Sequence, residues 1–175
     1  MIESSMFGVV VSFSPSGLVV AAAYITLMMA LAMFAFVFDA SWRQHVFGIG
    51  AANVLIFADT MLHEGMHGVV GWLVGMPPTK FALKSWYAPH TELNMSGIAP
   101  DAYLSAAALV AAAGPLASIA FGWLVIRLGV RGRSRTTDAI ARIIGGVIII
   151  NGVVNFVPLA PNDGWIISLW VRGLF

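Results

Sequence analysis

The chain has 175 residues, of which 59% are hydrophobic and 10% are charged, and its mean hydropathy of +0.90 lies outside the range of soluble globular domains. This composition indicates a membrane protein, and the net charge of +1 argues against nucleic acid as a partner, because phosphate-binding domains carry a clustered basic excess. The absence of cysteine excludes a cysteine nucleophile and thiolate metal ligands.

Four stretches are long and apolar enough to cross a bilayer, whose hydrocarbon core of about 30 Å takes roughly 20 helical residues. They run from about 17 to 38, 46 to 74, 102 to 128 and 140 to 157. The N-terminus lacks the basic residues of a signal peptide, so we expect the first span to be retained. Residues 165 to 175 would make only about 16 Å of helix and should form an interfacial or half helix. A polar interfacial turn should close the first span at Asp39, Trp42, Arg43 and His45.

Two other stretches favour strands. Residues 7 to 15, FGVVVSFSP, are β-branched and stop at Pro15. The proline-rich residues 75 to 100 include KFALKSWYA, which alternates weakly as a strand does. Pairing of these stretches would give a small sheet on one face of the helices. We therefore predict a single domain over residues 1–175, an all-α polytopic membrane protein with a bundle of about four transmembrane helices and a small β-sheet.

The second predicted helix contains FADTMLHEGMHGVV, which includes Asp59, His63, Glu64 and His67. At about 100° per residue these four side chains face one way. The two histidines, one turn apart, can offer imidazole nitrogens to one zinc ion, and Glu64 can take a proton from water there. Hydrogen-bonded core histidines are the alternative, but ionisable groups inside a bilayer helix favour a function. Asp59 either faces a cavity or accepts the N–H of a histidine that binds the metal.

A catalytic zinc site takes three protein ligands and leaves a fourth position for water. Asp163, in NGVVNFVPLAPNDGW, is the candidate for the third ligand. Pro158 and Pro161 interrupt the fourth helix, and non-helical backbone at membrane depth is tolerated only where it is buried or lines a cavity. Asp163 would then lie at a broken helix, or it would cap a short terminal helix at the membrane surface.

HEGMH in one membrane helix, followed by NFVPLAPNDG at the end of a later one, resembles the site-2 protease family of intramembrane zinc metalloproteases. That family pairs HExxH with N-x-x-P-x-x-x-x-D-G, and residues 111 to 118, AAAGPLAS, look like its Gly-Pro segment. The resemblance covers about residues 46 to 165. Asn162 stands where a leucine is common, and no insertion is long enough for the PDZ domain that many members carry. The fixed positions of the second motif are matched by Asn155, Pro158, Asp163 and Gly164.

The resemblance implies one zinc ion per chain, held by His63, His67 and Asp163, with Glu64 as the general base. It implies that Asn155 lies near the substrate carbonyl, and that strands around 7 to 15 and 80 to 95 form a membrane-associated sheet whose edge holds an unwound substrate. The expected function is hydrolysis of transmembrane protein substrates within the lipid bilayer of a prokaryotic cell, with gating by the core or by a regulatory membrane partner.

Other function classes stay open. A non-catalytic membrane protein would use the same residues to bind or transport metal, although a transporter would show repeats with paired broken helices. An aspartyl protease using Asp59 and Asp163 would leave HEGMH unexplained, and no serine lies in a glycine-framed nucleophile motif. His90 is interpreted as polar surface rather than as part of a site.

Charge distribution bears on orientation. Arg43 lies in the first connection, and several arginines flank the third, so both connections should lie on one side of the membrane. The positive-inside rule places that side in the cytoplasm, whereas the family keeps the loop after the HExxH helix in the cytosol. Both orientations stay open. The flanking arginines are Arg127, Arg131, Arg133, Arg135 and Arg142.

Overall fold

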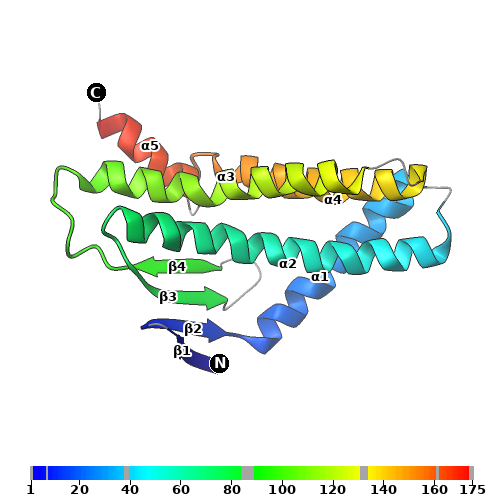
Figure 1. The fold of residues 1–175 in the computed structure, drawn as a ribbon, viewed down its shortest axis with the longest axis horizontal. Helices are drawn as coiled ribbons and strands as arrows, with labels where there is room; N and C mark the ends of the chain where they lie inside the picture. Colours follow the sequence, from blue (N-terminus) through cyan, green and yellow to red (C-terminus); the bar gives the residue numbers. More distant parts are fainter. Residues whose placement is uncertain are drawn as a thin grey trace.

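The computed structural model describes residues 2–6, 8–37, 40–83, 89–130, 134–160 and 162–173. The described chain forms a bundle of helices with a small sheet against one end of it (Figure 1). The predicted fold class is confirmed. The elements are, in chain order, β1 (Ile2–Met6), β2 (Val9–Phe13), α1 (Pro15–Phe36), α2 (Trp42–Leu73), β3 (Pro78–Leu83), β4 (His90–Leu93), α3 (Tyr103–Gly129), α4 (Arg135–Asn155) and α5 (Asp163–Gly173).

Helices α1 to α4 are each long and apolar enough to cross a membrane. Their outer faces carry large hydrophobic side chains, of which Phe34, Phe47 and Val54 expose 63%, 74% and 68% of their surface. An apolar surface of this extent would be unfavourable in water and suits contact with lipid chains. The four predicted spans are therefore present, and the short tail forms α5.

Helix α2 begins earlier than the sequence predicts. Ser41 accepts a hydrogen bond from the backbone N–H of Gln44, whose side chain in turn accepts from the backbone N–H of Ser41. This capping box satisfies amide groups that would otherwise lack partners at the helix start. The predicted interfacial turn is thus wrong for three residues, which lie in the first turn of α2: Trp42, Arg43 and His45. Asp39 lies outside the described residues.

Helix α4 begins at Arg135 rather than near residue 140, because Ser134 caps it by accepting a hydrogen bond from the backbone N–H of Thr137 at 3.1 Å. It ends at Asn155, as the prolines predict, and Pro158 follows in the non-helical connection to α5. Pro161 lies outside the described residues.

A Schellman motif ends α2 and turns the chain back toward the sheet. The backbone N–H of Met76 donates to the carbonyl of Gly71 at 2.7 Å, and that of Gly75 donates to Trp72 at 3.2 Å. Gly75 has a φ of +85°, a conformation that side-chain-bearing residues rarely adopt. The turn places β3 and β4 alongside the C-terminal half of α2, where the HEGMH motif lies.

The described strands form one sheet in the order β1-β2-β3-β4. β2 and β3 are parallel, and the two outer pairs are antiparallel. β4 is therefore at an edge of the sheet. β1 was not predicted, because its sequence IESSM lacks the β-branched run that marks β2; it pairs with β2 through a turn at Gly8, whose φ is +81°.

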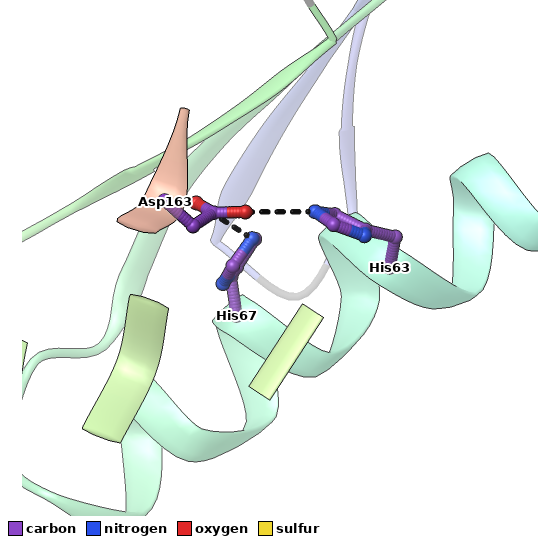
Figure 2. A group of neighbouring side chains, drawn as sticks. All are labelled: His63, His67 and Asp163. Atoms are coloured by element: carbon purple, nitrogen blue, oxygen red, sulfur yellow. Dashed lines mark hydrogen bonds and ion pairs between the residues drawn. The ribbon is translucent and has the colours of Figure 1, made fainter. Parts of the chain in front are cut away.

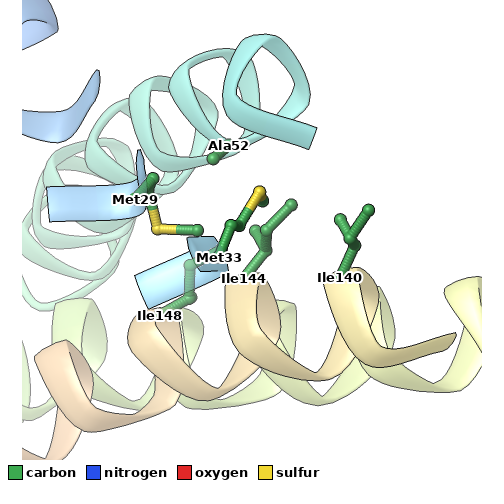
Figure 3. Packing of buried hydrophobic residues seen from close by; sticks show 6 residues of the cluster. All are labelled: Met29, Met33, Ala52, Ile140, Ile144 and Ile148. Atoms are coloured by element: carbon green, nitrogen blue, oxygen red, sulfur yellow. The ribbon is translucent and has the colours of Figure 1, made fainter. Parts of the chain in front are cut away.

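Helix α1 crosses the bundle obliquely and packs against α2 and α4 through its C-terminal half (Figures 1 and 3). The contact is close because Gly48 of α2 leaves room for the side chain of Met33, which a Cβ at position 48 would meet at 2.7 Å. The buried cluster between the three helices consists of Met29, Met33, Ala52, Ile140, Ile144 and Ile148.

Helices α3 and α4 approach so closely that their backbones touch. A Cβ at Gly145 would lie 2.5 Å from the carbonyl oxygen of Gly122, and a Cβ at Gly122 would lie 2.6 Å from the carbonyl oxygen of Gly145. Small residues at such crossings let membrane helices pack by van der Waals contact. This pair holds α3, which carries residues around the site, in fixed register with α4.

Substituting Gly145→Ala should lower the free energy of unfolding by about 1–3 kcal/mol, because the methyl group meets backbone that must shift. Gly146→Ala is the matched control, since a Cβ there meets nothing within 4 Å. It should be neutral or stabilising by up to about 1 kcal/mol through helix propensity. Reversible unfolding in detergent micelles measures both, and equal effects of the two variants would contradict the close crossing.

Candidate metal centre

Three side chains from two distant parts of the sequence converge at the C-terminal half of α2 (Figure 2). The Nε2 atom of His63 lies 3.1 Å from Oδ2 of Asp163, and the Nε2 atom of His67 lies 3.4 Å from Oδ1 of the same carboxylate. All three candidate ligand atoms lie within 4.8 Å of one another. The structure thus brings together the histidines of one motif and the aspartate of the other.

The spacing of these atoms fits a metal of zinc's size. Nitrogen and oxygen ligands lie about 2.0–2.2 Å from zinc, so two ligands of a tetrahedral site are about 3.3–3.6 Å apart. The separations of 3.1 and 3.4 Å are near this range. Two imidazoles and one carboxylate are also a donor set typical of catalytic zinc, which keeps a fourth position open.

The second nitrogen of each imidazole, Nδ1, is within hydrogen-bonding distance of a group on helix α3. Nδ1 of His67 lies 2.7 Å from the carbonyl oxygen of Val110, and Nδ1 of His63 lies 3.1 Å from the hydroxyl of Ser118. A carbonyl only accepts, so in the neutral ring His67 carries its proton on Nδ1 and leaves the Nε2 lone pair free. Such outer contacts fix ring orientation and tautomer in metal sites.

Gly114 of α3 provides the room for both rings. A Cβ at this position would lie 2.5 Å from Nε2 of His67 and 2.6 Å from Nε2 of His63. No other residue type fits between the helix backbone and the imidazoles. The Gly-Pro segment of the sequence therefore lies directly against the candidate ligands.

The break between α4 and α5 places Asp163. The side-chain amide of Asn162 donates to the carbonyl of Val154 at 3.1 Å and so satisfies an acceptor at the end of α4. Gly164 packs against the carbonyl groups of Phe156 and Val157, where a Cβ would overlap backbone atoms. Asp163 is the first residue of α5, and it faces the histidines from there.

The charge state of Asp163 suits a ligand. Burial alone would raise the pKa of its carboxyl, but hydrogen bonds from the protonated imidazoles of His63 and His67, together with their positive charge, hold the pKa below its ordinary value of 3.8. The side chain is therefore an anion at neutral pH.

Glu64 lies beside the histidines and is 6% exposed. The hydroxyl of Thr91, on the edge strand β4, lies 2.9 Å from Oε2 of Glu64 and 3.0 Å from the Glu64 carbonyl oxygen, and it donates to these acceptors. The sheet is thus attached to the HEGMH motif by the residue that contacts the glutamate. This contact holds the carboxylate in one place.

A cavity of about 1040 Å³ opens onto these residues. Its walls come from β4 and all five helices, and most of them are apolar. Asn155, the last residue of α4, and Asn162 line this cavity together with Glu64 and Asp163. Asp59 also lines it.

His90 has a more specific place than the polar surface that the sequence predicted. It is the first residue of β4 and lines the same cavity. Its Nε2 lies 3.4 Å from the carboxylate of Glu92. The side chain remains 44% exposed, so it lies at the rim of the cavity rather than among the candidate ligands.

Four contributors to the site could not be found by sequence spacing: Val110, Gly114, Ser118 and Thr91. Val110 acts through its backbone carbonyl, for which the side chain gives no signal. Ser118 and Thr91 belong to other elements and meet α2 only through packing. Gly114 could be noticed in the sequence only as part of the Gly-Pro segment that resembles the family.

Comparisons with known proteins bear on the fold. No family model matches the sequence, and no curated protein matches it. Among solved structures, the chain is similar to the site-2 protease from Methanocaldococcus jannaschii, with a TM-score of 0.60 and 14% sequence identity. The match covers 99% of this chain and 72% of that one. The likeness shows a shared fold.

Substituting Gly114→Ala should weaken the binding of a divalent metal by at least about tenfold, because the new methyl group displaces both imidazoles from their positions. Gly65→Ala is the control within the HEGMH motif, since a Cβ there meets nothing within 4 Å. Titration with Zn²⁺ against a competing chelator in detergent measures the affinities. Unchanged affinity in the Gly114 variant would contradict this placement of the site.

Proposed function

We propose that the chain is a single-domain intramembrane zinc metalloprotease that hydrolyses peptide bonds of membrane-embedded protein segments. The observation that carries the proposal is the meeting of His63 and His67 with Asp163, a hundred positions along the chain. The fold shared with a site-2 protease supports it. A structural zinc site closes with four protein ligands, whereas three ligands beside a cavity favour catalysis.

His63, His67 and Asp163 are the residues that would hold the zinc ion. When bound, zinc would lower the pKa of water to about 7 and would polarise a carbonyl group. The apolar walls of the cavity strengthen such electrostatic effects, because the local dielectric constant is lower than that of water. The anionic Asp163 offsets part of the metal's charge.

Glu64 serves as the general base and acid. It accepts a proton from the attacking water and delivers it to the leaving amine as the peptide bond breaks. Its carboxylate lines the cavity next to the histidines. Thr91 donates a hydrogen bond to Oε2 of Glu64, which orients the carboxylate.

Asn155 is suited to contact the substrate. Its side-chain amide can donate a hydrogen bond to the scissile carbonyl, where negative charge develops during attack. Its position at the last turn of α4 places it on the cavity wall that continues to Asn162 and Asp163. Asn162 is engaged with the end of α4, so Asn155 is the better candidate for this role.

The substrate segment must be extended at the site, because a helical peptide bond is shielded by its own hydrogen bonds. β4 lies at the edge of the described sheet and contributes His90 to Leu93 to the cavity wall. An extended segment can add to such an edge by backbone hydrogen bonds. The Thr91 contact would bring that segment next to Glu64.

Substituting Glu64→Gln should lower the cleavage rate by about 10²- to 10⁴-fold while Zn²⁺ affinity stays close to that of the wild type. The amide keeps the shape of the side chain but cannot accept the proton. Suitable probes are single-span peptides with a helix-breaking Gly-Pro pair near the centre, reconstituted in micelles and analysed by mass spectrometry.

Asp101→Asn is the control, because Asp101 is an exposed carboxylate in the connection before α3, outside the residues that line the cavity. It should cleave like the wild type. Cleavage retained by the Glu64 variant would remove Glu64 from its role. A wild-type chain that binds zinc but cleaves none of the peptides would favour the non-catalytic metal-binding function.

A further inference from the structure

Asp59 is a buried carboxylate that the proposed reaction does not use. It lies on α2 one turn before His63, and it is 1% exposed. Its Oδ1 has no hydrogen-bond partner among the described residues. A charged or polar group placed this deep in a membrane helix is costly unless it serves a function or finds a partner.

Two polar side chains from neighbouring helices lie against this carboxyl group. They are the Ser118 hydroxyl on α3 and the Asn151 amide on α4. Ser118 is fully buried, and its oxygen is also 3.1 Å from Nδ1 of His63. Ser118 therefore stands between Asp59 and a candidate metal ligand. The direct bond from the imidazole to the carboxylate, which the sequence offered as one interpretation, is replaced by contact through a hydroxyl.

The chemistry of Asp59, Ser118 and His63 determines which group donates and which accepts in each hydrogen bond between them. When Asp59 is ionised, its carboxylate only accepts, so the single hydroxyl proton of Ser118 points to it. The Ser118 oxygen is then an acceptor toward His63, and Nδ1 of that ring must carry a proton. The lone pair of a neutral His63 is consequently on Nε2, the nitrogen that faces Asp163.

We propose that Asp59 is a positioning residue of the metal centre, acting through Ser118 to fix the tautomer and orientation of His63. This inference rests on the proposed zinc site. It gives the two histidines different supports: a backbone carbonyl for His67 and a side-chain relay for His63. A carboxylate at the end of the relay makes the imidazole a stronger donor to the metal, as outer carboxylates do in other zinc sites.

A purely structural role for Asp59 makes a different prediction. The carboxyl contacts α3 and α4 and could serve only to hold the helices together. In that case its loss would lower stability and leave the metal affinity of the folded protein unchanged. Metal affinity and the coupling between the two relay residues therefore separate the roles.

The test is a double-mutant cycle on the full chain in micelles, with Asp59→Asn, Ser118→Ala and the double variant. Zn²⁺ affinity is measured against a competing chelator, and the absorption spectrum of Co²⁺ reports ligand geometry. Each single variant should bind Zn²⁺ about 10- to 100-fold more weakly than the wild type. The double variant should bind no more weakly than the weaker single variant, because both substitutions interrupt the same relay.

Thr60→Val is the matched control, since the Thr60 hydroxyl donates to the Ile56 carbonyl of its own helix at 3.1 Å. Its Zn²⁺ affinity should equal that of the wild type. Helix content and unfolding temperature without metal show that each variant is folded, and if Asp59→Asn does not fold, Ser118→Ala decides alone. Affinities of the relay variants equal to the wild type, or additive losses in the double variant, would overturn the relay alone. A wild-type chain that binds no Zn²⁺ would overturn both the relay and the proposed function.

Discussion

Ionisable side chains in membrane-spanning helices need partners from the protein, because hydrocarbon offers none. In this chain α2 carries Asp59, His63, Glu64 and His67 on one face, and the histidines and the glutamate are held by α3, β4 and α5. His67 contacts a carbonyl of α3, His63 contacts Ser118, and Glu64 contacts Thr91 of β4. Asp163 joins the two histidines from the start of α5. α3, the sheet and the break between α4 and α5 are arranged around α2 so that the ionisable side chains on this face have hydrogen-bond partners.

Close backbone packing makes these contacts achievable. Glycines bring α3 against α4 and leave room for the imidazoles beside Gly114, while Gly164 lets α5 start against the end of α4. A side chain at any of these positions would separate the elements that carry the site. The apolar cluster between α1, α2 and α4 borders the cavity through Met29 and Ile148, whereas glycines and polar side chains lie around the candidate ligands.

Much of this was predictable from the sequence, and the limits have physical causes. The spans follow from hydropathy, and the convergence of His63 and His67 follows from helical spacing of four residues. Placing Asp163 with them required the resemblance of both motifs to those of the site-2 protease family, since helical spacing cannot predict a contact between residues a hundred positions apart. The contacts of His67, His63 and Glu64 join residues 43, 55 and 27 positions apart, so they depend on tertiary packing. β1 and the early start of α2 were missed because pairing and capping, rather than apolar pattern, decide them.

The zinc content per chain of detergent-purified protein, compared between the wild type and Asp163→Ala, tests the central claim most directly. About one zinc ion per chain is expected in the wild type, because the three ligands match a catalytic site. The variant should lose zinc or bind it much more weakly, since only two of the three ligands, the histidines of α2, remain. Absence of zinc from a folded wild-type chain supplied with the metal, or equal content in both proteins, would contradict a site that joins α2 to α5.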